Sequence, residues 1–222
     1  MTLFTAAAPP FMKNGFVLGC ERTRAAILVD PGDEVADLLR HVRDERLAPV
    51  AILLTHAHLD HVSGVRHATD ALGVPVWLHA DDQPLYERVA EQAEMFGLQM
   101  EQPPPVDHFY AGDGAWGLFG DYEVSVHHTP GHCPGGVCLA VTCVVGPSRL
   151  EGLFVGDTLF AGSIGRTDLP GGDYETLMRS ITEVLFRFPD DAVVHSGHGP
   201  DTTIGRERAT NPFVLGWLQG RS

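Results

Sequence analysis

The residues Thr55-His56-Ala57-His58-Leu59-Asp60-His61 place three imidazoles and a carboxylate directly after the apolar run 50–54. Side chains at positions i and i+2 of an extended chain point to the same face, so His56 and His58 can converge on one ion just past a buried strand. Apolar residues then recur at helical spacing, which predicts that Asp60 and His61 begin a helix and turn toward a neighbouring position. One short turn can therefore serve two metal ions, provided that other parts of the chain complete each site.

Length and composition predict a globular protein with a large core. The chain has 222 residues, of which 44% are hydrophobic, and this is enough for one sizeable domain or two small ones. No low-complexity segment or interdomain linker interrupts it. We therefore expect a single domain that spans residues 1–222.

The charge balance excludes several kinds of partner. The formal net charge is -14 and Lys13 is the only lysine, so the chain has no basic patch for nucleic acid or for an anionic membrane. No apolar run approaches the roughly 20 residues that span a bilayer. Residues 1–12 lack the basic start and the apolar stretch of a signal peptide, which predicts a cytoplasmic protein. Since the charge balance disfavours nucleic acid and membrane, the expected partner is a small-molecule substrate.

The order of expected elements suggests two similar halves. Periodicity predicts strands at 16–20, 24–30, 50–54, 74–79, 122–127, 136–145, 153–157 and 192–195. Helices are expected after Pro31-Gly32, from Asp60 onward, over 81–96 and from Asp173. Residues 97–115 read as a long connection, and a connection of that length in a compact domain is expected to form a pocket wall.

Polar residues at the ends of these strands stand beside glycines, which let the backbone approach a site closely. Together with the first stretch they suggest a set of nitrogen and oxygen donors for two metals. His56, His58 and His132 would serve one metal, Asp60, His61 and His198 the other, and Asp157 would lie between them. Such donors suit zinc, and iron or manganese as alternatives.

The four cysteines show no metal-binding spacing. Cys20, Cys133, Cys138 and Cys143 form neither C-x-x-C nor a zinc-ribbon pattern, so we expect them to be reduced and mostly buried. Cys133 follows a candidate ligand, but the donor set is complete without it. Among the remaining histidines, His128 and His195 are candidates for orienting the ligands by hydrogen bonds.

Six short motifs follow one another along the chain: Asp30-Pro31-Gly32, Thr55–His61, Thr129–His132, Gly156-Asp157-Thr158-Leu159-Phe160, Gly165-Arg166-Thr167-Asp168 and Gly197-His198-Gly199. They resemble the successive motifs of the metallo-β-lactamase superfamily, particularly those of the glyoxalase II-like hydrolases in their short bacterial form. The resemblance implies an α/β fold, an αββα sandwich of two mixed β-sheets flanked by helices. It also implies a two-metal site at one edge with the ligands just suggested.

The implied activity is hydrolysis by a metal-bridging hydroxide, most readily of a thioester such as S-lactoylglutathione. Two divalent ions exceed the charge of two ligand carboxylates and can lower the pKa of a bound water to about 7. Asp60 and Asp157 are the predicted catalytic carboxylates, with Asp60 also able to take up a proton. A thioester suits the site because its thiolate leaves with little protonation.

Two alternatives remain open at this point. Sulfur dioxygenases of the same superfamily use a single iron and share the Gly-Arg-Thr-Asp stretch, and a lactonase or other ester hydrolase would use the same two-metal chemistry.

Arg166 and Asp168 occupy the positions of the family's glutathione-contacting Lys and Tyr. They are predicted to contact substrate, and the competing interpretation is an ion pair that braces their loop.

Overall fold

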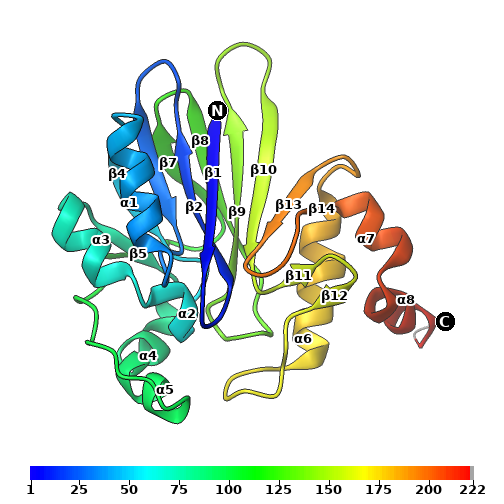
Figure 1. Ribbon diagram of the computed structural model, residues 1–222. Coiled ribbons are helices and arrows are strands. Elements are labelled where there is room, and N and C mark those ends of the chain that lie inside the picture. Colours follow the sequence, from blue (N-terminus) through cyan, green and yellow to red (C-terminus); the bar gives the residue numbers. More distant parts are fainter. Residues whose placement is uncertain (221–222) are drawn as a thin grey trace.

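The computed structural model describes residues 1–220, which form two packed β-sheets with helices on both outer faces (Figure 1). The first sheet has the order β1-β2-β3-β4-β5-β6, formed by Thr2–Ala8, Lys13–Gly19, Ala25–Val29, Ala48–Leu53, Val76–Leu78 and His108–Phe109. The second has the order β14-β13-β10-β9-β8-β7, formed by Thr202–Thr203, Val193–Ser196, Arg149–Gly156, Val137–Cys143, Tyr122–His128 and Gly114–Phe119. A separate hairpin pairs β11 (Leu159–Phe160) with β12 (Ser163–Ile164).

Helices cover the outer face of each sheet. The helices that follow strands of the first half are α1 (Val35–Asp44), α2 (Leu59–Val62), α3 (Val65–Leu72), α4 (Gln83–Tyr86) and α5 (Val89–Met95). The second half has α6 (Tyr174–Arg179), which continues as a π-helical turn over Ser180–Val184 and a 3-10 turn over Leu185–Arg187, and then α7 (Ile204–Thr210) and α8 (Pro212–Gln219). Within the described residues, no helix is both long and apolar enough to cross a membrane.

The apolar core has three layers. The middle layer lies between the sheets, where Phe16 and Leu53 of the first sheet pack with Val126 and Phe154 of the second. One outer layer joins the first sheet to α1–α5, and the other joins the second sheet to α6–α8. Residues 51–53 of β4 are buried on both faces, and such strands read as continuous apolar runs, which is why the run 50–54 could be recognised as a strand from sequence.

The predicted α/β architecture of two mixed sheets flanked by helices is confirmed. Strand β1 was missed, because its alternation of half-buried and exposed side chains at the edge of the sheet leaves only a weak apolar signal. The helix expected from Asp60 is divided into α2 and α3 at Gly64. There the Gly64 N–H donates to the Pro31 carbonyl over 3.0 Å, and a side chain at Gly64 would collide with the Gly32 carbonyl.

The only lysine of the chain is buried at the base of the sandwich. Lys13 Nζ lies 2.8 Å from Glu34 Oε1 and also donates to the Asp30 carbonyl, and the side chains of Lys13 and Glu34 are 2% and 1% exposed. Glu34 Oε1 accepts a second hydrogen bond from Gly32 N–H over 2.8 Å. This ion pair therefore joins β2 to the turn between β3 and α1.

Replacing Lys13 by Met is expected to destabilise the metal-free protein by about 3–5 kcal/mol, because the Glu34 carboxylate is then buried without its counter-charge. The double variant Lys13→Met/Glu34→Leu removes both charges and should lose less than the single variant. Urea denaturation followed by circular dichroism measures both free energies of unfolding. A double variant at least as unstable as the single one would contradict this account of the pair.

Candidate metal centre

Four strand ends bring the candidate ligands together at one edge of the sandwich. His56 and His58 follow β4, His132 follows β8, Asp157 follows β10 and His198 follows β13. Strands β8 and β10 are both antiparallel to β9, and β13 is parallel to β10, so these three carboxyl ends share an edge. In Figure 1, α2 lies at the lower edge of the sandwich and carries Asp60 and His61.

Three of the predicted ligands form a compact trio. The donor atoms of His56, His58 and His132 all lie within 4.8 Å of one another. His58 Nδ1 and His132 Nε2 are 2.8 Å apart, and the ring of His56 stands nearly perpendicular to both neighbouring rings. The structure therefore brings these three predicted ligands together.

Asp60, His61 and His198 form a second trio within the same distance limit. His198 Nε2 is 3.0 Å from Asp60 Oδ2, and His61 Nε2 is 3.8 Å from the same oxygen. Asp157 lies between the two trios: its Oδ1 is 3.3 Å from His61 Nε2, and its Oδ2 is 3.7 Å from His132 Nε2. All seven predicted ligands therefore meet in one place.

Three buried atoms at the centre have no hydrogen-bond partner among residues 1–220, the part of the chain that the structure describes. They are His56 Nε2, His61 Nε2 and Asp157 Oδ1. A buried polar atom without a partner is costly, so native proteins satisfy such atoms with protein groups, water or ions. Two imidazole nitrogens and a carboxylate oxygen are ligand types that divalent transition metals accept, so the residues fit a two-cation site.

The electrostatics divide the centre into two parts. Burial and the neighbouring His132 lower the pKa of His58 to about 3, which keeps its lone pair available. Burial would also lower the pKa of His61, but Asp157, Asp60 and Asp30 together raise it to about 10. One part of the centre thus offers neutral nitrogen ligands, and the other attracts positive charge.

Asp30 orients two of the histidines from behind. This buried carboxylate accepts Thr55 N–H over 2.7 Å and Thr55 Oγ1–H over 2.5 Å, and His61 Nδ1 donates to it over 2.9 Å. Thr55 Oγ1 in turn lies 3.1 Å from His56 Nδ1. Each imidazole is therefore fixed through Nδ1 and presents Nε2 to the centre, which is how protein ligands are commonly held around metals.

Asp82 fixes the loops that carry candidate ligands in the two halves of the molecule by accepting hydrogen bonds from both. Its buried carboxylate accepts Ala57 N–H over 2.9 Å and Gly135 N–H over 2.6 Å, and Cys133 Sγ lies 3.2 Å from Oδ2. It thereby joins the loop that carries His56 to the loop that carries His132. Burial and Asp82 raise the pKa of the Cys133 thiol well above its usual value, so a thiolate is disfavoured there.

The His198 loop is held by the N-terminal hairpin. Asn14 Nδ2 donates to the carbonyls of Ser196 and Gly199 over 3.0 and 2.9 Å, and Asn14 N–H donates to the Gly197 carbonyl over 2.7 Å. A Cβ atom at Gly197 would collide with Asp157 Oδ1. Only glycine allows the backbone to pass this close to the carboxylate.

A cavity of about 220 Å³ opens onto the centre and is lined by Phe11, Leu59, Arg166 and several of the ligands. Arg166 Nε and Nη2 each donate to a carboxylate oxygen of Asp168 over 2.7 Å. The guanidinium lowers the pKa of Asp168 to about 2. Arg166 thus stands on the cavity wall with its charge paired, while Asp168 is absent from the described lining.

The supporting residues were only partly visible in the sequence. His195 is buried against Phe154, with Nδ1 3.0 Å from Asp201, and His128 Nε2 donates to the Pro134 carbonyl over 2.9 Å. Among the described residues, neither histidine forms a hydrogen bond to a candidate ligand. Asp30 and Asp82 were not assigned to the site from sequence, although the position of Asp30 at the end of a strand, before Pro31, was a usable signal.

Comparison with known proteins agrees with the fold and the centre. Residues 8–198 match the model of the metallo-β-lactamase superfamily. Hydroxyacylglutathione hydrolase GloC of Haemophilus influenzae is 36% identical over 205 residues, which cover 92% of this chain and 93% of the relative. The B3 metallo-β-lactamase BLEG-1 is 37% identical with a TM-score of 0.85, over 96% of this chain and 99% of that structure.

The structure of TTHA1623 in a di-iron-bound form is 41% identical with a TM-score of 0.80, and covers 95% of this chain and 99% of the other. A sandwich of two mixed sheets with a histidine and aspartate cluster at one edge is typical of a superfamily of metallo-hydrolases. The chain belongs to the metallo-β-lactamase superfamily.

Metal analysis tests the seven-ligand assignment. We expect about two metal ions per chain in the fully loaded protein, and we expect Asp157→Ala to weaken binding at both positions because its carboxylate lies between the two trios. Inductively coupled plasma mass spectrometry after dialysis measures the stoichiometry. Asp191→Ala is the matched control, because it removes an exposed carboxylate that precedes β13 and is not a candidate ligand. A fully active preparation with one ion per chain would contradict the assignment.

The role of Asp30 can be tested separately. Asp30→Asn replaces an acceptor by an amide donor beside His61 Nδ1–H, so metal affinity should fall by about 10–100-fold. Competition with a chromogenic chelator measures that affinity, and circular dichroism verifies the fold. Asp33→Asn is the control, because this exposed neighbour does not contact the ligands in the described hydrogen bonds. An affinity within twofold of wild type would show that Asp30 does not position the ligands.

Proposed function

We propose that the protein is a binuclear metal-dependent hydrolase of thioesters, similar in activity to hydroxyacylglutathione hydrolases. The observation that carries this proposal is the complete set of two trios and Asp157 around three unpartnered buried atoms. The GloC relative, whose name describes hydrolysis of a hydroxyacyl thioester of glutathione, adds support. We propose zinc as the resident ion, with iron or manganese as alternatives.

The reaction breaks one carbon–sulfur bond. When bound, two divalent ions would lower the pKa of a water molecule and polarise the substrate carbonyl. Water oxygen bonds to the carbonyl carbon, the sulfur leaves as a thiolate, and the products are a carboxylate and a thiol. Phe11 and Leu59 form an apolar wall of the cavity and exclude bulk water from the reacting carbonyl.

Asp60 is the residue that we propose takes up the released proton. It lines the cavity, and its Oδ2 faces His198 Nε2 at 3.0 Å. Although burial raises the pKa of Asp60, His61 and His198 lower it overall, so the carboxylate stays ionised and holds a proton only in passing. Arg166 is proposed to attract an anionic group of the substrate at the cavity wall. Its ion pair with Asp168 reduces this attraction.

No observation favours the alternatives over thioester hydrolysis. A single-iron sulfur dioxygenase needs only one trio, whereas this chain presents two trios and an aspartate between them. β-Lactam hydrolysis is associated with BLEG-1, which is about as similar to this chain as GloC is. A lactonase would use the same donors, and no observation favours it.

Parallel assays of one metal-loaded preparation test the proposal. We expect hydrolysis of S-lactoylglutathione to exceed both nitrocefin hydrolysis and oxygen uptake with glutathione persulfide, and chelation to abolish it. Because Arg166 is paired with Asp168, the glutathione thioester should have a kcat/KM less than about a thousandfold, or roughly 4 kcal/mol, above that of a simple thiol analogue. Oxygen uptake without thioester hydrolysis would overturn the proposal in favour of the dioxygenase.

A further inference from the structure

Three cavities lie in a row between the candidate metal centre and the exposed side of α3. The inner cavity, described above, is bounded by Phe11 and Leu59. A second cavity of about 320 Å³ is lined by the same two side chains. A third, of about 290 Å³, shares Ser63, Met100 and Glu101 with the second. Since neighbouring cavities share walls, the second and third form a groove that leads away from the centre, called here the outer groove.

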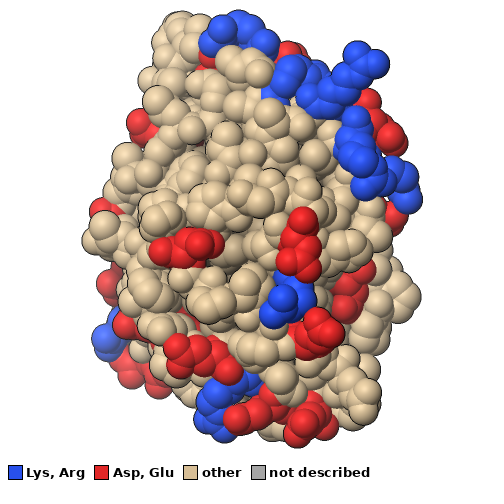
Figure 2. Space-filling view, turned by 90° about the vertical axis from the view of Figure 1, so that its left-hand side faces the viewer, with Lys and Arg blue, Asp and Glu red and all other residues tan. Residues whose placement is uncertain are grey.

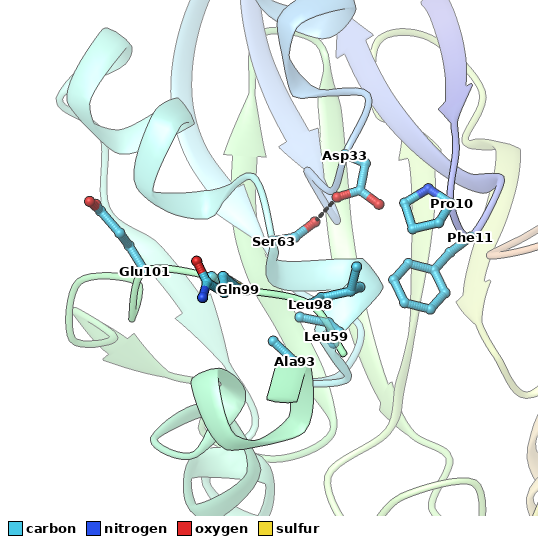
Figure 3. Close-up of a pocket in the computed structure, with 10 residues that line it drawn as sticks. Pro10, Phe11, Asp33, Leu59, Ser63, Ala93, Leu98, Gln99 and Glu101 are labelled. Atoms are coloured by element: carbon cyan, nitrogen blue, oxygen red, sulfur yellow. Dashed lines mark hydrogen bonds between the residues drawn. The ribbon is translucent and has the colours of Figure 1, made fainter. Parts of the chain in front are cut away.

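The outer groove changes character along its length (Figure 3). Phe11, Leu59 and Leu98 form an apolar neck next to the inner cavity. Beyond the neck, Ser63 Oγ donates to Asp33 Oδ1 over 2.9 Å, and Gln99 and Glu101 line the opposite wall. An apolar neck that opens into neutral and acidic groups suits a flexible polar chain with amide or hydroxyl groups.

The charge of the outer groove is unsuited to phosphate. Among its described lining residues, Arg66 is the only arginine or lysine, and three carboxylates line the same groove: Asp33, Asp70 and Glu101. Arg66 Nη2 donates to the Gln102 carbonyl over 2.7 Å, and its Nε lies 3.6 Å from Glu101. On the face seen in Figure 2, basic side chains gather mainly near the top, and acidic ones predominate lower down. A phosphorylated chain would therefore meet carboxylates rather than unpaired cations.

The dimensions decide which part of a thioester can enter. The inner cavity, at about 220 Å³, has room for the reacting carbonyl and one short arm. A longer arm has to pass Phe11 and Leu59 into the second cavity. A small hydroxyacyl group fits the inner space, so the long arm is the one that ends in the leaving sulfur.

We propose that the outer groove binds the leaving thiol and selects an elongated thiol that is uncharged or carries an amino group, over one that carries phosphates. This inference rests on the proposed thioester hydrolysis and names its substrate class. Residues 98–101, within the connection expected to form a pocket wall, supply the selection through Gln99 and Glu101. The enzyme would accordingly discriminate against coenzyme A thioesters, although their pantetheine portion fits.

Three acetyl thioesters of graded length and charge test the groove: those of N-acetylcysteamine, pantetheine and coenzyme A. We expect kcat/KM for the pantetheine thioester to exceed that for the N-acetylcysteamine thioester by about tenfold, which is about 1.4 kcal/mol. The coenzyme A thioester should fall below the pantetheine thioester, because its phosphates approach the acidic groove. S-octanoyl-N-acetylcysteamine, with a long acyl arm, should gain nothing over the acetyl form. A larger gain from the long acyl arm than from pantetheine would overturn the assignment to the leaving thiol.

Two pairs of variants test whether the outer groove causes the expected preference among these thioesters. Gln99→Trp should remove the advantage of the pantetheine thioester over the N-acetylcysteamine thioester, whereas Glu94→Trp, exposed on α5 outside the groove, should retain that advantage. Asp33→Asn/Glu101→Gln should raise kcat/KM for the coenzyme A thioester by about threefold to tenfold. Asp44→Asn/Glu94→Gln removes the same charge elsewhere and should have no effect.

A binding measurement separates failure of the groove from failure of the proposed activity. Calorimetric titration of metal-loaded protein with a pantetheine thioether ketone, which cannot be hydrolysed, should show about tenfold weaker binding for Gln99→Trp than for Glu94→Trp. Equal binding by these two variants, with equal rates on the short and long thioesters, would overturn the groove and leave the hydrolase standing. Absence of all thioester hydrolysis would overturn the hydrolase, and the titration would still decide whether the groove binds the thiol chain.

Discussion

The carboxylate of Asp30 is the group on which the rest of the centre depends. It lies at the end of β3, is buried, and accepts hydrogen bonds from the end of β4 and from α2. A buried carboxylate is stable only when its oxygens are satisfied, and here the donors are the backbone and side chain of Thr55 and the His61 imidazole. The same bonds that satisfy Asp30 therefore fix the direction of two candidate ligands. Fold stability and site geometry are served by one set of interactions.

Asp82 extends this arrangement from one sheet to the other. The two sheets meet through apolar side chains, which fix their separation but not the position of their loops to a fraction of an ångström. Hydrogen bonds from Ala57 and Gly135 to one buried carboxylate supply that positional constraint. The four cysteines are unpaired, as their spacing predicted, so this link between the halves is made without a disulfide.

The sequence predicted the parts of the molecule whose signal is local. Apolar runs indicated the buried strands, and the spacing of His56, His58 and Asp60 indicated the candidate ligands that follow β4. The edge strand β1 and the division of α2 from α3 depend on partners far along the chain, which no local pattern reveals. Asp82 was missed for the same reason, because the backbone donors that define its role, those of Ala57 and Gly135, are 25 or more residues away.

The antiparallel contact between Lys13 and His198 connects the start of β2 to the candidate metal centre, so it would affect how firmly the protein retains metal ions. The candidate ligands extend from residue 56 to residue 198, and their last loop rests on the first hairpin, so metal retention reports the integrity of nearly the whole chain. Fraying of α8 would leave every ligand in place, whereas opening of β2 or β13 would release the His198 loop. Metal ions would bind the folded chain in preference to the unfolded one. The free metal concentration in the cell would therefore set the free energy of unfolding of both sheets together.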